Sequence, residues 1–141
     1  MNAQAGETVS ITSATIGQFG RYLLSAGKNH FISDQRVAVG GPGEAINAGE
    51  LLLSSLGSCS LGLIQKTAKE QGNVLREARS EVSFRRHATD PTRYGWIRIA
   101  VRLSSVTAAE AETLVAGFTA NCPIYNTLKR GGPVEISWSV S

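Results

Sequence analysis

The spacing of apolar residues in the first quarter of the chain predicts a meander of short strands. Val9 and Ile11 alternate with polar residues, so Thr8–Thr15 is predicted to be a half-buried strand. Two more short strands are predicted at Tyr22–Leu24 and His30–Ile32. The residues between them, Ala-Gly-Lys-Asn at 26–29, are typical of a hairpin turn.

A long helix is predicted next, over Ala48–Gln71, with Asn47 as its N-cap and Gly72 as its end. Apolar residues recur at intervals of four, three and four, which is the period of one helix face. This stripe places Cys59 on the buried face of the helix. Weak helix formers gather around that cysteine and suggest close packing against another helix or a second subunit: Gly57, Ser58, Ser60 and Gly62.

The second half of the chain begins with two alternating segments. Ala78–Phe84 and Trp96–Leu103 each alternate apolar and polar residues and are separated by turn residues at 90–92, which predicts an antiparallel hairpin. Thr107 and Glu110 have the spacing of a capping box, so a helix is predicted to follow and to end near Ala120.

A short helix and a final strand complete the predicted elements. The helix is predicted to start at Asn121 as its cap, to accommodate Pro123 in its first turn and to end near Arg130. The alternation over Val134–Val140 predicts a strand. Strands and helices in this order indicate an α+β fold, and the length of 141 residues with no internal linker predicts a single domain over residues 1–141.

Composition and charge exclude several classes of protein. The chain is 42% hydrophobic and 18% charged, which suits a globular protein, and no run approaches the ~18–20 apolar residues of a membrane helix. The first residues do not resemble a secretory signal, so a cytoplasmic protein with no membrane partner is expected. The net charge of +3 is spread along the chain. Arginines of the predicted hairpin are interrupted by Glu77 and Glu81, so we interpret them as a solvated sheet surface rather than a nucleic-acid site.

The chain has only two cysteines, Cys59 and Cys122, which are too few for a disulfide scaffold. There is no Cys-x-x-Cys motif, and His30 and His87 are not spaced with the cysteines as zinc ligands are, so neither a metal nor a cofactor is expected. The Gly-Gly-Pro-Gly run at 40–43 lacks the lysine of a phosphate-binding loop, and no Gly-x-Ser-x-Gly motif indicates a serine hydrolase.

The positions of the two cysteines allow a reactive and a structural interpretation. Cys122 lies in the first turn of a predicted helix, where backbone N–H groups and the helix dipole favour a thiolate, but a small packing residue would suit this position equally. Cys59 taken alone fits a core residue better. Because burial disfavours the charged form of a thiol, a reactive Cys59 would need a nearby cation or hydrogen-bond donor.

Arg36 is the preferred candidate for that cation. It precedes the glycine-rich run within a segment from about Asp34 to Ile46 that is predicted to be an exposed loop. Glu50, in the first turn of the long helix, could orient the guanidinium through a bidentate pair. An acidic residue at this position also commonly does no more than complement the helix dipole.

Two motifs together identify a family resemblance. They are the segment 47–59, Asn-Ala-Gly-Glu-Leu-Leu-Leu-Ser-Ser-Leu-Gly-Ser-Cys, and the segment 121–128, Asn-Cys-Pro-Ile-Tyr-Asn-Thr-Leu, whose cysteines are 63 positions apart. With the order of elements, they resemble the OsmC/Ohr family of osmotically inducible and organic hydroperoxide resistance proteins. The resemblance extends from about Gly20 to Val140.

The resemblance implies a fold and an activity. It implies an OsmC-like fold, with antiparallel sheets wrapped around long central helices in an intertwined homodimer. It also implies a thiol peroxidase without metal or other cofactor, acting on organic hydroperoxides in oxidative stress and recycled by a thiol or dithiol reductant such as a lipoyl group. Cys59 matches the cysteine that attacks the peroxide and Cys122 the one that resolves the resulting sulfenic acid as a disulfide.

The match has one departure at the predicted site. Peroxidases of this family carry a glutamate ten residues before the attacking cysteine, where this chain has Gly49, and Glu50 follows one residue later. Arg36 corresponds to the site arginine, with Arg21 as a competitor. Two interpretations therefore stay open: a hydroperoxide-reducing enzyme that uses Cys59, Cys122, Arg36 and Glu50, or an OsmC-like protein that binds a hydrophobic ligand or senses redox state at the dimer interface.

Overall fold

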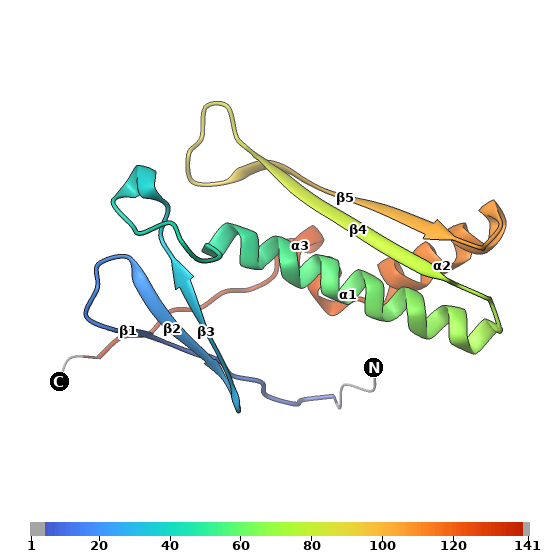
Figure 1. Ribbon diagram of the computed structural model, residues 1–141, viewed down its shortest axis with the longest axis horizontal. Coiled ribbons are helices and arrows are strands. Elements are labelled where there is room, and N and C mark those ends of the chain that lie inside the picture. The colour runs from blue at the N-terminus through green and yellow to red at the C-terminus, as the bar shows by residue number, and fades with distance from the viewer. Residues whose placement is uncertain (1–4, 140–141) are drawn as a thin grey trace. The chain divides into compact units, whose positions relative to one another are not determined.

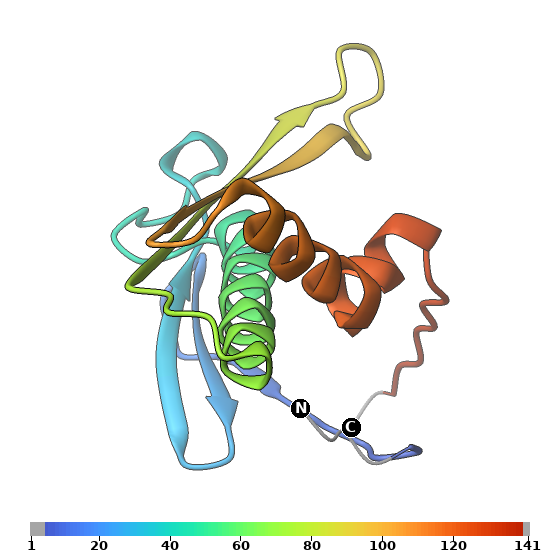
Figure 2. The ribbon, with the colours of Figure 1, turned by 90° about the vertical axis from the view of Figure 1, so that its right-hand side faces the viewer.

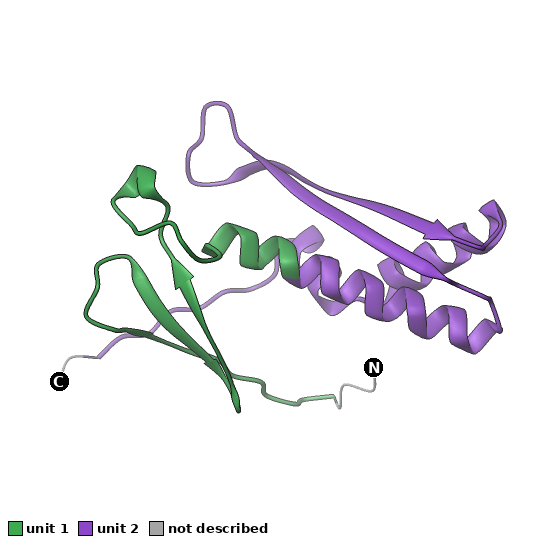
Figure 3. Cartoon of the chain, in the orientation of Figure 1, with its two compact units in different colours: residues 1–54 green, residues 55–141 purple. Residues whose placement is uncertain are grey.

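The structure is a computed structural model, and it describes residues 5–139. Within them the chain is of mixed α+β class with antiparallel sheets, as predicted. It forms two compact units, residues 1–54 and 55–141, and each is described on its own (Figure 3). The prediction of a single domain over residues 1–141 stays a prediction. Over residues 5–139, no helix is long and apolar enough to cross a membrane.

The first unit contains a three-stranded antiparallel sheet in the order β1 (Thr12–Thr15), β2 (Arg21–Ala26), β3 (Asn29–Asp34) (Figure 1). Ala26 pairs with Asn29, which leaves a two-residue turn whose Gly27 has φ +60°. The predicted hairpin is thus confirmed. The predicted half-buried strand over Thr8–Thr15 is wrong in extent and burial, because β1 is a short edge strand that is exposed along its whole length.

The segment that follows β3 is anchored by a buried carboxylate. Asp34 accepts two hydrogen bonds of 2.8 Å from the Arg21 guanidinium and one each from the backbone N–H groups of Glu44 and Ala45, at 2.9 and 3.0 Å. The Arg21 hydrogen bonds outweigh burial and hold the pKa of Asp34 down at about 2. The predicted loop is therefore pinned at both ends, and it contains one short 3₁₀ turn, η1 (Val37–Val39).

The long helix α1 spans Ala48–Gln71 and confirms the predicted bounds. Its N-terminus is a reciprocal capping box: Asn47 Oδ1 accepts from the N–H of Glu50 at 3.0 Å, and Glu50 Oε2 accepts from the N–H of Asn47 at 2.9 Å. Gly72, with φ +70°, follows the last residue of the helix. Residues 48–54 of α1 belong to the first unit and residues 55–71 to the second.

The second unit contains the predicted antiparallel hairpin, β4 (Glu77–Arg86) and β5 (Tyr94–Ser104). One face of the hairpin carries partly buried residues, and this face meets α1. Ser60 of α1 donates to the Ser80 hydroxyl at 3.1 Å, and a Cβ placed on Gly57 would lie 3.6 Å from the Val82 side chain. Around Gly62, by contrast, a Cβ would meet no described atom within 4 Å, so the close packing predicted there is not formed within the chain.

Two further helices complete the second unit, α2 (Ala108–Asn121) and α3 (Pro123–Arg130). The capping box of Thr107 and Glu110 is present. Figure 2 shows the bend between the two helices, where Cys122 has extended backbone angles. Leu114 and Phe118 of α2 pack with α1 in one buried cluster, which also contains Cys59, Leu63, Ile64, Ala68 and Cys122. The core of this unit therefore surrounds both cysteines.

The strand predicted over Val134–Val140 is not formed. Residues 132–139 have no strand structure, and Val140 lies outside the described residues. The apolar side chains of this segment are almost fully exposed: Val134 94%, Ile136 94% and Trp138 85%. A strand needs a neighbour to satisfy its backbone groups, and within residues 5–139 this segment has no such partner.

Candidate functional site

The two cysteines, 63 residues apart in sequence, meet in the core of the second unit. Cys122 Sγ donates to Cys59 Sγ across 2.6 Å, and both residues are free thiols. Cys59 comes from the middle of α1 and is 8% exposed, whereas Cys122 lies at the α2–α3 junction and is fully buried. The two sulfurs are thus within reach of each other for a thiol–disulfide reaction.

Cys122 is itself the N-cap of α3. Its sulfur accepts a hydrogen bond from the N–H of Tyr125 at 3.3 Å, and Pro123 occupies the first helical position. The prediction that Asn121 is the cap is wrong, because Asn121 ends α2 and its amide donates back to the carbonyl of Gly117 at 2.9 Å. The sulfur of Cys122 therefore faces a backbone donor at the positive end of a helix, which suits a sulfur that acquires negative charge.

Cys59 has a less favourable setting for ionisation. Burial raises the pKa of its thiol, and the hydrogen bond with Cys122 and the negative charge that Cys122 can carry raise it further. A thiol held in this way is mostly protonated near neutral pH. Reaction at Cys59 therefore requires an additional positive group or hydrogen-bond donor that favours its thiolate.

The charged residues that the sequence suggested for this task lie in the first unit. Arg36 is exposed, and over residues 5–139 it forms no ion pair. Glu50 does not pair with Arg36, because its carboxylate closes the capping box of α1 with Asn47. Arg21 is held by Asp34 and by Glu44, each at 2.8 Å. Of these two arginines, Arg36 is therefore the one whose guanidinium is not paired with a carboxylate of residues 5–139.

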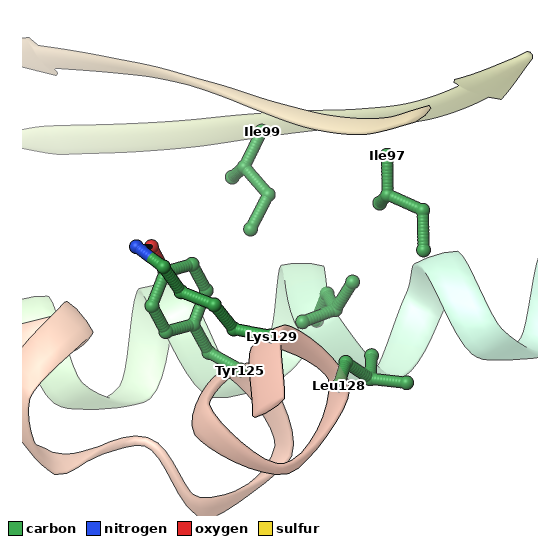
Figure 4. Close-up of a pocket in the computed structure, with 6 residues that line it drawn as sticks. Ile97, Ile99, Tyr125, Leu128 and Lys129 are labelled. Atoms are coloured by element: carbon green, nitrogen blue, oxygen red, sulfur yellow. Dashed lines mark hydrogen bonds between the residues drawn. The ribbon is translucent and has the colours of Figure 1, made fainter. Parts of the chain in front are cut away.

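A pocket of about 370 Å³ lies in the second unit, next to the buried cluster that contains the two cysteines. It lies between β5, α1 and α3 and is lined by Leu56, Ile97, Ile99, Tyr125, Leu128 and Lys129 (Figure 4). Leu56 is three residues before Cys59, or about 4.5 Å along the helix axis. Tyr125 is the residue whose N–H binds the Cys122 sulfur. The pocket therefore adjoins the buried cluster that contains the cysteines, because Ile99 and Tyr125 also pack against that cluster.

Sequence reasoning did not single out Tyr125 and Lys129. A signal was present, because the two residues are four apart in the short helix that follows Cys122, which places them on one helix face. Groups of three or more metal-ligating side chains do not occur in the part of the chain that the structure describes.

The fold and the buried thiol pair define an α+β protein with a two-cysteine site. The chain belongs to the OsmC family, since it matches the family description "OsmC-like protein" over residues 41–137. A search of curated proteins found no match.

Solved structures show the same fold. An OsmC-like protein from Mycoplasma pneumoniae has 16% identity and a TM-score of 0.73 over 88% of this chain and 89% of its own. The organic hydroperoxide resistance protein OsmC from Legionella pneumophila has 24% identity and a TM-score of 0.66 over 89% and 92%. An organic hydroperoxide resistance protein from Elizabethkingia anophelis has 16% identity and a TM-score of 0.69 over 92% and 91%.

Proposed function

We propose that this protein is a thiol peroxidase that reduces organic hydroperoxides, with Cys59 as the attacking and Cys122 as the resolving cysteine. The observation that carries the proposal is the 2.6 Å distance between their sulfurs inside a core that both helices share. Membership of a family that includes hydroperoxide resistance proteins supports the same activity.

The proposed reaction needs the two cysteines, the hydroperoxide and an external thiol or dithiol reductant. The Cys59 thiolate attacks the terminal oxygen of the hydroperoxide, the O–O bond breaks, and the alkoxide leaves and takes up a proton as the alcohol. Cys59 is then a sulfenic acid. The Cys122 thiol attacks its sulfur, an S–S bond forms, and the hydroxyl departs as water. A thiol or dithiol reductant, for example of the lipoyl type, returns both cysteines to thiols by exchange.

One equivalent of cumene hydroperoxide is expected to convert the reduced protein into an intramolecular Cys59–Cys122 disulfide. Mass spectrometry should show the loss of two hydrogen atoms from the chain, and peptide mapping should place the bridge between the two cysteines. Cys122→Ser is the control, since it can gain an oxygen at Cys59 but cannot form the bridge. A wild-type chain that stays reduced under these conditions, or that gains only oxygen atoms, contradicts resolution by Cys122.

We assign to Arg36 the positive charge that Cys59 requires, because its guanidinium is not neutralised by a carboxylate among residues 5–139 whereas that of Arg21 is. Glu50 was expected to orient the Arg36 guanidinium. Because its carboxylate caps α1 instead, Glu50 is a weaker candidate for that role.

Replacement of Arg36 by glutamine should raise the pKa of Cys59 by about one unit, and so lower the thiolate fraction near neutral pH about tenfold. The sign follows from the charge, since loss of a cation disfavours the thiolate. The rate of Cys59 alkylation as a function of pH, measured on a Cys122→Ser background, gives this midpoint. Arg36→Lys should restore most of the shift, and Lys28→Gln, which removes a charge from the β2–β3 turn, should leave it unchanged. An unaltered midpoint in Arg36→Gln rules out the assignment.

The active form is proposed to be a homodimer, as the resemblance to OsmC/Ohr proteins implies. The exposed side chains of Val134, Ile136 and Trp138 keep the alternation of a strand, although no strand of residues 5–139 pairs with them. A second copy of the chain would supply both the backbone partner and the apolar cover.

A second candidate function is supported by the pocket. Its apolar walls could hold a hydrophobic ligand without turnover, and the raised pKa of Cys59 would suit an unreactive thiol. Peroxide consumption distinguishes the two functions, because a binding protein would not accelerate it.

A further inference from the structure

The helices α2 and α3 meet at a single residue, Cys122, which is the C-cap of the first and the N-cap of the second (Figure 2). The N–H of Cys122 donates to the carbonyl of Phe118 at 2.9 Å, which closes the last turn of α2. Its sulfur accepts from the N–H of Tyr125 and so caps α3. A change in the angle between the two helices would therefore move this sulfur relative to Cys59.

Pro123 leaves a gap in the hydrogen bonding of this junction. In a continuous α-helix, the N–H of residue 123 would donate to the carbonyl of Thr119, four residues earlier. Proline has no N–H to donate. Thr119 is half-buried, so its carbonyl needs a donor from elsewhere in the chain.

The side chain of Asn126 supplies that donor. Its Nδ2 donates to the carbonyl of Thr119 at 3.0 Å and to the carbonyl of Cys122 at 2.9 Å. An asparagine amide has two N–H bonds, so these two contacts use both of them. One contact reaches the last turn of α2 and the other reaches the cap of α3. The amide therefore ties the two helices together at the residue that carries the sulfur.

We propose that Asn126 is a positioning residue for the bond between the two cysteines, because it holds the α2–α3 junction in the geometry that keeps the Cys122 sulfur within reach of Cys59. The inference rests on the proposed function and adds a residue to its second step. In that step the Cys122 thiol attacks the sulfur of the Cys59 sulfenic acid, an S–S bond forms and water leaves. Asn126 acts through the backbone of Cys122, so the attack of Cys59 on the hydroperoxide should not depend on it.

Formation of this bond competes with a second oxidation. A Cys59 sulfenic acid that Cys122 does not capture can react with another molecule of hydroperoxide, which leaves as the alcohol and converts the sulfenic acid to a sulfinic acid. Both products arise after the same first step. The ratio of disulfide to sulfinic acid therefore measures how well Cys122 is placed, independently of the rate of the first attack.

Asn126→Leu tests the proposal, since leucine has nearly the size of asparagine and cannot donate a hydrogen bond. Cumene hydroperoxide is raised until the wild type gives both products, which mass spectrometry quantifies. The ratio of disulfide to sulfinic acid should fall about tenfold in Asn126→Leu, because misplacement of a reacting group by a fraction of an ångström has effects of this order. The rate at which the first equivalent of hydroperoxide is consumed should be unchanged.

Asn121→Leu is the matched control. The side-chain amide of Asn121 also donates to a carbonyl of α2, that of Gly117 at 2.9 Å, but this bond stays within α2 and does not reach α3. Both substitutions remove hydrogen bonds and should lower the melting temperature, whereas only Asn126→Leu should change the product ratio. An unchanged ratio in Asn126→Leu, or an equal fall in the two variants, overturns the proposal.

A measurement without hydroperoxide separates this proposal from the proposed function. In a buffer of reduced and oxidised glutathione, one cysteine forms a mixed disulfide and releases one glutathione thiol, and the other cysteine then displaces the second glutathione. The equilibrium between the two thiols and the Cys59–Cys122 disulfide gives the effective concentration of one sulfur at the other. Asn126→Leu should lower this concentration about tenfold, and Asn121→Leu should keep it.

The two measurements fail in different ways. Absence of hydroperoxide consumption together with a lower effective concentration in Asn126→Leu refutes the peroxidase and leaves the positioning role supported. Hydroperoxide turnover together with equal effective concentrations in wild type and Asn126→Leu refutes the positioning role alone.

Discussion

Replacement of Cys59 by serine is expected to abolish hydroperoxide reduction. The rate with cumene hydroperoxide and dihydrolipoamide should fall at least about a thousandfold, to the background of the reductant alone, because a hydroxyl cannot replace the thiolate as nucleophile. The coupled loss of cumene hydroperoxide and dihydrolipoamide measures this rate. Cys59 is 8% exposed, and serine has nearly the same shape as cysteine. The variant should therefore stay folded, which circular dichroism can verify.

Cys122→Ser provides the comparison that isolates attack from resolution. Without reductant, this variant should still consume one equivalent of hydroperoxide and leave an oxidised Cys59, whereas Cys59→Ser should consume none. Equal steady-state rates for wild type and Cys59→Ser would end the peroxidase proposal. Consumption by Cys59→Ser but not by Cys122→Ser would reverse the assigned roles.

Replacement of Ile136 by aspartate is expected to dissociate the proposed dimer. Ile136 is 94% exposed, so within residues 5–139 its apolar surface is not covered and is available to a second copy of the chain. Burial of one isoleucine contributes about 1.5–3 kcal/mol, and a symmetric dimer contains two, so the dissociation constant should rise roughly a hundredfold or more. Sedimentation equilibrium should detect a change from twice the chain mass of 14.9 kDa to that of a single chain.

Ser137→Asp is the control for this experiment. It adds the same charge one residue away, on the opposite side of the alternating segment, and should leave the dimer intact. A wild-type protein that sediments as a monomer would contradict the dimer itself. Dissociation by both substitutions would instead indicate that added charge, rather than the strand face, is responsible.

Local sequence signals predicted most of the elements correctly. The helix α1 carries a full set of such signals, with Asn47 at its start, Gly72 at its end and an apolar stripe between them, so its bounds agree with the prediction. The hairpin β4–β5 was equally clear, since the alternation of Ala78–Phe84 and Trp96–Leu103 lies within its two paired strands. In each case the information lies within a few residues of the element that it specifies.

The final strand shows where local signals are insufficient. The alternation from Val134 onward is as regular as that of β5, but among residues 5–139 the segment pairs with no strand. Alternation records which side chains can be buried, whereas a strand also needs a backbone partner, and that partner can belong to another molecule.

The candidate site was predicted in part. The two cysteines were identified from the motifs that contain them. The preference for asparagine as a helix cap led to Asn121 as the predicted N-cap of α3. The N-cap is instead Cys122, because Cys122 is the residue with extended backbone angles between the two helices. Glu50 was expected to face an arginine and instead caps its own helix, because the N–H of Asn47 is nearer in the chain than any guanidinium. Tyr125 and Lys129 could be identified as pocket residues only from the structure, because residues of α1 and β5 form the rest of that pocket.

The sequence by itself determined the α+β class, the long helix, the hairpin and the identity of the two thiols, because periodicity, capping residues and cysteine content are properties of local stretches of chain. Only the tertiary structure decided that the sulfurs of Cys59 and Cys122 lie 2.6 Å apart, that burial raises the pKa of Cys59, and that a lysine edges the adjoining pocket. Distance, burial and the shape of a pocket arise from the packing of segments far apart in sequence, so no local pattern contains them.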